Sequence, residues 1–186
     1  MTPHLTTFTG RIVNPLDLKP KDINIRDIAH ALALCNRFAG HTRLPISVAQ
    51  HSVFVSRLLP PEQALQGLLH DASEAYLGDV TKWLKESDEF AAYRIAEERV
   101  QSQIFEYFGC PTVISADVWN ADKLMVRYEA MRSGLSIHHP NYPVPTAEEQ
   151  ERVGKWDFWQ WEMSEDVFLY TYRVIENMGF VMNQAE

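Results

Sequence analysis

The stretch that decides the fold reads Gln63-Ala64-Leu65-Gln66-Gly67-Leu68-Leu69-His70-Asp71-Ala72-Ser73-Glu74-Ala75-Tyr76-Leu77. Ala64, Leu68, Ala72 and Ala75 recur at the three- and four-residue spacing of one helix face. Gly78 follows and is a typical helix stop. The spacing predicts one helix over residues 63–77 with a buried apolar face, and it places a histidine and an aspartate side by side within that helix.

Helical spacing continues on both sides of this stretch. Good N-cap residues, such as Asn24 and Ser47, and stop glycines bound further predicted helices over residues 24–40, 47–59, 89–108, 115–133 and 164–178. Residues 5–13 form either a short strand or an extended arm, and residues 137–146 form a proline-rich loop. The sequence therefore predicts an all-α fold, a compact single-domain helical bundle over residues 1–186 with a short extended N-terminal arm.

The charge balance limits the class of partner. There are 17 Lys and Arg against 25 Asp and Glu, and the net charge is −8. This balance argues against a nucleic-acid polymer or an anionic membrane surface as the main partner. A small anionic substrate is still compatible with it, because a metal ion can reverse the local field.

Targeting signals and cysteine usage indicate the compartment. No segment approaches the roughly 18 uninterrupted apolar residues of a membrane span. The first residues have neither the basic nor the apolar region of a secretory signal. Cys35 and Cys110 are too few for a disulfide framework and read as reduced thiols. We therefore expect a cytoplasmic protein that is not associated with a membrane.

Four polar residues fall on predicted helices that also have apolar faces, namely His51, His70, Asp71 and Asp122. A buried imidazole or carboxylate without a partner is costly. A divalent metal ion would supply that partner, and mixed nitrogen and oxygen ligation suits Mn, Fe, Co, Zn or Mg. A hydrogen-bonded core histidine is the structural alternative. Glu74 follows His70 by four residues and shares its helix face.

These residues lie within a longer, ordered set of motifs. The stretches are Phe8-Thr9-Gly10-Arg11, Asp27-Ile28-Ala29-His30-Ala31-Leu32, Asn36-Arg37-Phe38-Ala39-Gly40-His41, Ser47-Val48-Ala49-Gln50-His51-Ser52 and His70-Asp71-Ala72-Ser73-Glu74-Ala75-Tyr76, followed by Asp79, Ala121-Asp122-Lys123 and Glu129. With this set the chain resembles the HD-domain metal-dependent phosphohydrolases, and it looks closest to the bacterial and phage branch that acts on deoxynucleotides. The resemblance covers residues 5–135.

The resemblance implies roles for individual residues. Glu74 matches the catalytic acidic residue of that family, and Arg37-Phe38 matches an Arg-aromatic pair that contacts the nucleotide. Asp79 matches a residue near the sugar, and His41 also fits the family pattern. The family fold is a helical bundle with its metal held between the helices. The residues that match its metal ligands are His51, His70, Asp71 and Asp122.

The implied reaction is metal-dependent cleavage of the phosphorus–O5′ ester of a deoxyribonucleotide. The substrate is either a monophosphate, which releases phosphate, or a triphosphate, which releases triphosphate. Arg37 offers a planar fork to phosphate oxygens, and Lys85 adds a second cation. A phosphodiesterase for cyclic or signalling nucleotides and a catalytically inert nucleotide-binding module are the alternatives. The aromatic residues 156–161 indicate packing or subunit contact, so we expect a homo-oligomer.

Overall fold

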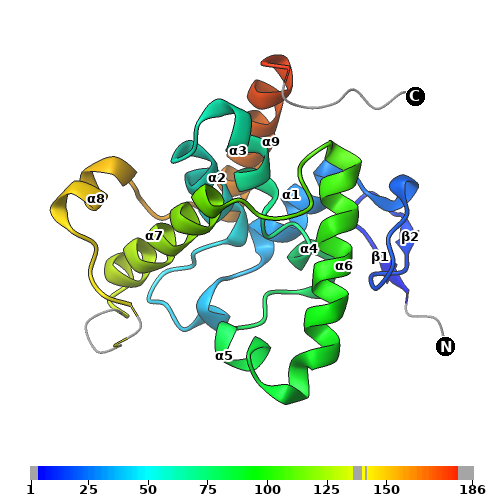
Figure 1. Ribbon diagram of the computed structural model, residues 1–186, viewed down its shortest axis with the longest axis horizontal. Coiled ribbons are helices and arrows are strands. Elements are labelled where there is room, and N and C mark those ends of the chain that lie inside the picture. The colour runs from blue at the N-terminus through cyan, green and yellow to red at the C-terminus, as the bar shows by residue number, and fades with distance from the viewer. Residues whose placement is uncertain (1–3, 136–139, 141, 180–186) are drawn as a thin grey trace.

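The central helix of the fold is α2 (Val48–Arg57), in a computed structural model that describes residues 4–135, 140 and 142–179. Every residue from Val48 to Ser56 is buried, polar ones included. A helix enclosed on all sides has to satisfy its polar side chains through its neighbours. Figure 1 shows other helices around it, and those packed against α2 are α1 (Ile25–Leu34), α3 (Pro61–Leu69), α7 (Ala116–Arg132) and α9 (Trp161–Asn177).

Shorter elements complete the fold around these helices. The N-terminal arm is a small antiparallel hairpin in which Leu5 pairs with Val13. The long helix α6 (Ala91–Phe108) stands beside it (Figure 1). The other elements are β1 (Leu5–Thr6), β2 (Ile12–Val13), η1 (Pro20–Asp22), η2 (Phe38–Gly40), α4 (Glu74–Leu77), α5 (Lys82–Lys85), η3 (Asp88–Phe90) and α8 (Ala147–Val153).

Two clusters of buried apolar side chains form the core, and α2 contributes to both. The larger cluster joins α2 to α1, α3, α6 and α9 and includes Phe105 and Phe168, which are fully buried. The smaller cluster joins α2 to α7 and includes Met125 and Trp156. The all-α prediction is confirmed. Among the described residues, no helix is long and apolar enough to cross a membrane.

The helix predicted over residues 63–77 is wrong in one respect, because it is broken in the middle. α3 ends at Leu69 and α4 begins at Glu74. Gln101 on α6 supplies hydrogen bonds at the break: its amide donates to the Leu69 carbonyl (2.7 Å) and its oxygen accepts from the Ser73 N–H (3.0 Å). The break therefore leaves His70 and Asp71 at a helix end, not inside a helix.

Other predicted boundaries also need correction. The first helix ends at Leu34, well before Gly40. The last helix begins at Trp161, and Ser164 bonds back to the Gln160 carbonyl instead of capping it. α5 and α8 were not predicted, although the reciprocal bonds between Thr146 and Glu149 are a sequence-visible capping box. In the predicted loop over residues 137–146, positions 137–139 and 141 lie outside the described residues.

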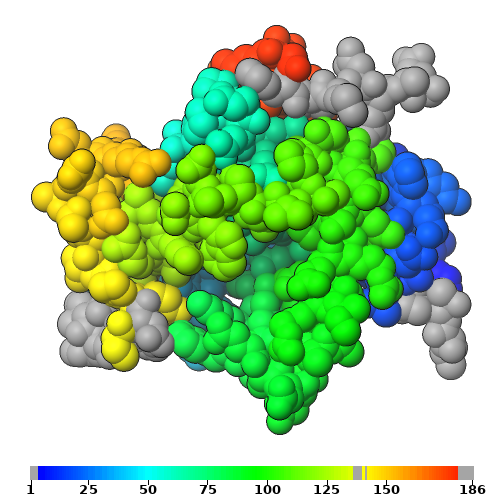
Figure 2. Space-filling view, viewed as in Figure 1, coloured from blue at the N-terminus to red at the C-terminus, as the bar shows by residue number. Residues whose placement is uncertain are grey.

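The aromatic segment over residues 156–161 is mainly a packing element. Trp156 is only 2% exposed and its ring lies 4.8 Å from Phe158 and 6.1 Å from Tyr128, between ring centroids. Trp161 is partly exposed at the start of α9. The expected homo-oligomer and the single-domain assignment stay predictions. On the face drawn in Figure 2 the surface is hollowed between α7 and the corner formed by α5 and α6.

Candidate metal centre

Side chains from three parts of the fold meet at one polar cluster. His51 comes from α2, His70 and Asp71 from the end of α3, and Asp122 from α7. One ligand atom from each of His51, His70 and Asp71 lies within 4.8 Å of the others, so this trio could hold a metal ion. Asp122 Oδ1 lies 3.0 Å from His51 Nε2 and 3.8 Å from His70 Nε2. The fold thus brings together the four residues predicted as ligands.

A hydrogen bond fixes the tautomer of His70, and two carboxylates flank the ring of His51. The Nδ1 atom of His70 lies 2.8 Å from the Gly67 carbonyl, which can only accept, so Nδ1 carries the proton. The Nδ1 and Nε2 atoms of His51 lie 3.0 Å from Glu129 Oε1 and from Asp122 Oδ1, so a carboxylate accepts on either side of this ring. In the neutral His70 ring the Nε2 lone pair then faces the cluster. The Nε2 atom of His70 is buried and has no hydrogen-bond partner among the described residues.

The cluster needs a cation between its imidazole and carboxylate groups. His51 Nε2 lies 3.0 Å from Asp122 Oδ1 and His70 Nε2 lies 3.3 Å from Asp71 Oδ2, so a proton or a metal ion has to lie between each nitrogen and its carboxylate. Without a metal a proton has to fill the gap: burial lowers the pKa of His70, but Asp71 and Asp122 outweigh it and raise that pKa well above its ordinary value. Two imidazoles and two carboxylates also form a donor set that a divalent transition metal accepts, so the residues present fit such an ion.

Glu129 ties the cluster to Arg37. Its carboxylate is fully buried and accepts from His51 Nδ1 and from Arg37 Nε, the latter at 3.0 Å. Arg37 also reaches Asp71 Oδ2 through Nη1 at 3.3 Å. Its backbone is held where the chain leaves α1, since the Arg37 N–H donates to the Ile46 carbonyl at 2.9 Å. We assigned Glu129 no role from the sequence, although it follows Asp122 by seven residues on the same helix face.

Glu74 and Lys85 lie against each other beside the cluster. Glu74 is buried, and its Oε1 accepts from Lys85 Nζ at 3.2 Å. Burial, together with the charges of Asp71 and Asp79, raises the pKa of Glu74 well above its ordinary value. Lys85 was predicted to contact phosphate; the structure places its ammonium between Glu74 and Glu97.

Of the other residues predicted to contact the substrate, some lie beside the polar cluster and one does not. The Arg37 guanidinium lies over the Phe38 ring at 5.7 Å, and Phe38 meets Tyr142 edge-on with 6.0 Å between centroids. Asp79 is part-buried, and burial raises its pKa against the opposing charges of Arg37 and Lys85. His41 is exposed just after η2, and no described side-chain contact joins it to the cluster.

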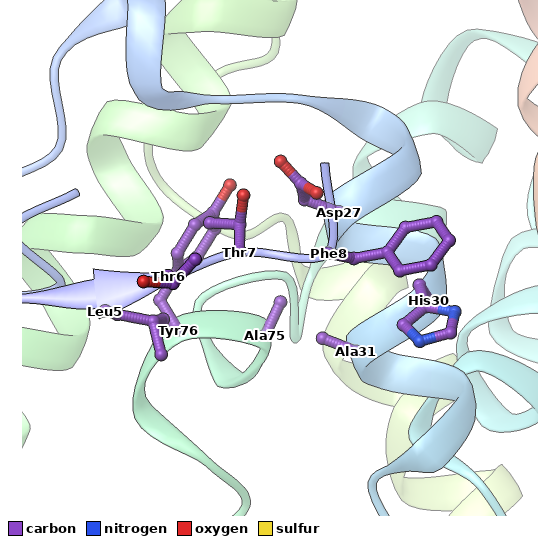
Figure 3. A pocket seen from close by; sticks show the side chains of 9 residues that line it. All are labelled: Leu5, Thr6, Thr7, Phe8, Asp27, His30, Ala31, Ala75 and Tyr76. Atoms are coloured by element: carbon purple, nitrogen blue, oxygen red, sulfur yellow. The ribbon is translucent and has the colours of Figure 1, made fainter. Parts of the chain in front are cut away.

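A separate pocket of about 250 Å³ lies beside the N-terminal hairpin. Figure 3 shows its walls, with Phe8 stacked on His30 and the Asp27 carboxylate at the rim. The Asp27 oxygens are already used, because they accept from the Thr9 N–H (2.6 Å) and the Thr9 hydroxyl (2.9 Å). None of the residues predicted for the functional site lines this pocket.

The chain is 40% identical over 131 residues to the uncharacterized protein YfdR of Escherichia coli, an alignment that covers 70% of this chain and 72% of YfdR. The chain belongs to the YfdR family. It is also 35% identical over 136 residues to an uncharacterized protein of Rhodobacter capsulatus, covering 66% of this chain and 69% of that protein. No protein-family model matches the chain. Since both relatives are described as uncharacterized, membership of the YfdR family assigns no activity by itself.

Proposed function

We propose that the protein is a divalent-metal-dependent phosphohydrolase of the HD-domain type that cleaves the phosphorus–O5′ ester of deoxyribonucleotides. The orientation of His51 and His70 carries this proposal. The His70 ring donates its Nδ1 proton to the Gly67 carbonyl and turns Nε2 toward Asp71, and the His51 ring lies between the carboxylates of Glu129 and Asp122. That arrangement is costly for a structural histidine pair and is expected of a metal centre. The ordered motifs of the sequence support the same family, and the free thiols support a cytoplasmic location.

The residues around the cluster have different roles in the proposed phosphoester hydrolysis. A divalent ion, when bound, supplies an activated water and polarises a phosphoryl oxygen. Arg37, held by Glu129 and Asp71, presents a fixed positive charge to the phosphate. Burial raises the pKa of Glu74, which favours the protonated carboxyl that can give a proton to the leaving O5′.

A product-resolved nucleotide panel tests the proposal. The protein is stripped of metal, reloaded with Mn²⁺ or Co²⁺, and offered each deoxynucleoside mono- and triphosphate and a set of cyclic nucleotides. We expect phosphate or triphosphate together with the free deoxynucleoside. In water enriched in ¹⁸O the label is expected in the released phosphate, because the attack falls on phosphorus.

Two variants distinguish the role of a metal ligand from the role of the general acid. Asp71→Asn should lose both the metal and the turnover, whereas Glu74→Gln should keep the metal and lose most of the rate. Glu106→Gln, an exposed acid on α6, is the control and should behave as the unmodified protein. Absence of any product from every deoxynucleotide would overturn the proposal. Turnover of cyclic nucleotides alone would favour the phosphodiesterase, and nucleotide binding without turnover would favour the inert module.

A further inference from the structure

Glu97 on α6 is a part-buried carboxylate that no sequence motif singled out. Its Oε1 lies 2.5 Å from Lys85 Nζ, which also lies 3.2 Å from Glu74 Oε1. The lysine ammonium therefore joins two carboxylates from different helices, α4 and α6. The Lys85–Glu97 contact is the shorter of the two, so Glu97 is the stronger anchor of the ammonium.

The same face of α6 also holds the backbone around Lys85. Arg94 donates to the carbonyl of Lys85 and, at 2.6 Å, to that of Ser87. Tyr93 donates to the Gly78 carbonyl at 2.8 Å, at the residue that ends α4. Residues 93, 94 and 97 lie on neighbouring turns of one helix face. Hydrogen bonds from α6 thus hold both ends of the segment that connects Glu74 to Lys85.

Glu74 has few other constraints on its carboxyl group. Its Oε1 accepts from Lys85, while its Oε2 is buried and has no hydrogen-bond partner among the described residues. A lysine on a flexible stem holds a carboxylate in one place only if the lysine is itself anchored. Glu97 supplies that anchor, and Oε2 is left for another partner.

We propose that Glu97 is a positioning residue that anchors Lys85, so that Lys85 holds Glu74 Oε1 and leaves Glu74 Oε2 for proton transfer. This inference rests on the proposed function, in which Glu74 is the general acid. It also assigns Lys85 a different task from phosphate binding. A phosphate-binding lysine would be released by loss of Glu97 and would bind substrate more tightly, whereas a positioning lysine would lose its place beside Glu74.

Steady-state kinetics with Mn²⁺ and a deoxynucleotide distinguish these two tasks. Glu97→Gln is expected to lower kcat about tenfold or more, with KM nearly unchanged, since proton transfer by a positioned acid contributes at least that much. Lys85→Arg should retain more activity than Lys85→Met. Glu98→Gln changes the exposed neighbour on the same helix and should keep the kinetic constants of the unmodified protein. A lower KM in Glu97→Gln with kcat unchanged would overturn the inference.

A second measurement does not depend on turnover. Acetylation of lysines by an activated ester, followed by mass spectrometry, should modify Lys85 much more slowly than the exposed Lys82. Glu97→Gln should bring the rate at Lys85 toward that at Lys82 and leave Mn²⁺ affinity unchanged; Glu98→Gln should do neither. If the unmodified protein hydrolyses no nucleotide, the proposed function fails. If Lys85 labelling is the same in Glu97→Gln as in the unmodified protein, the anchoring role fails whatever the activity.

Discussion

Glu129 fixes two functional side chains with one carboxylate. It is fully buried, and its two oxygens accept separately from His51 Nδ1 and Arg37 Nε. A buried carboxylate is tolerated only when it is paired and hydrogen-bonded in this way. The orientation of the His51 ring and the placement of the Arg37 charge therefore depend on the same residue.

Glu129→Gln should weaken metal binding about 10–100-fold, the usual effect of losing a carboxylate behind a ligating histidine. The amide keeps the shape of the carboxylate but lacks the negative charge that pairs with Arg37 and accepts from His51 Nδ1. Titration calorimetry with Mn²⁺ measures the change, with Glu106→Gln as the control. An affinity equal to that of the unmodified protein would show that Glu129 does not orient the site.

Cys110 should react slowly with alkylating reagents in the folded protein. Burial raises the pKa of its thiol to about 12. Since the thiolate is the reactive form, only about one thiol in ten thousand is reactive at pH 8. Iodoacetamide labelling followed by mass spectrometry should be slow in buffer and fast in guanidinium chloride. Equal rates in the two conditions would contradict the buried environment of this thiol.

From the sequence, site residues could be predicted where a polar or charged side chain interrupts the apolar face of a predicted helix. His70 and Asp71 stand out because charged groups interrupt an apolar face, and His51 and Asp122 for the same reason. Glu129 falls within the motif set without a role of its own, and Glu97 falls outside every motif, because glutamates are common on helices. Their importance comes from partners far away in the chain, such as Arg37 for Glu129, and local periodicity holds no information about such contacts.

At the scale of elements, the break between α3 and α4 positions the site. Gln101, on another helix, makes the two hydrogen bonds that substitute for helical ones at Leu69 and Ser73. Its side chain is 8% exposed, so water cannot readily replace it. The local geometry of His70 and Asp71 is therefore set partly by α6.

Gln101→Leu should destabilise the protein by about 1–3 kcal/mol, because the buried Ser73 N–H loses its acceptor, whereas the Leu69 carbonyl still accepts from the Ala72 N–H. For a protein of this size each kcal/mol corresponds to about 2–4 °C in the unfolding temperature. Thermal unfolding without metal measures this effect. Ser102→Ala, on the same helix, is the matched control and should unfold near the original temperature. An unchanged unfolding temperature in Gln101→Leu would show that the break between α3 and α4 is stable without the hydrogen bonds of Gln101.

The elements themselves were predictable where caps and periodicity agree. α2 and α7 follow the N-cap residues Ser47 and Ser115, whose hydroxyls accept the expected N–H bonds. The break at His70 was not predictable, because Ala72 and Ala75 continue the helical spacing across it. A contact from α6 overrides that local preference. α5, with only four residues, is too short to leave a periodic signal.

At the scale of the whole molecule, part of the net charge of −8 is concentrated at one place. Asp71, Asp122 and Glu129 lie in the same cluster, beside Glu74, whose raised pKa favours its neutral form. Arg37 and Lys85 offset only part of this charge. A divalent cation should therefore stabilise the folded chain, since the unfolded chain does not assemble the cluster.

Mn²⁺ should raise the unfolding temperature, and a chelator should reverse the shift. At a hundredfold excess over Kd the folded state gains about 2.7 kcal/mol. That gain corresponds to about 5–10 °C for a protein of this size. Asp71→Asn should abolish most of the shift, and sodium chloride at equal ionic strength should not reproduce it. A shift of the same size in Asp71→Asn would place the bound cation elsewhere.

The end of α3 at Leu69 has a further electrostatic consequence. The peptide dipoles of a helix leave a partial negative charge at its C-terminus, within about one turn of the last residue. His70 and Asp71 follow that terminus directly, so the backbone of α3 adds an attraction for cations that no side-chain substitution removes. A bare anion meets repulsion there. In the proposed reaction a phosphate would therefore be held through a cation and Arg37, and we expect the metal to bind first and the nucleotide second.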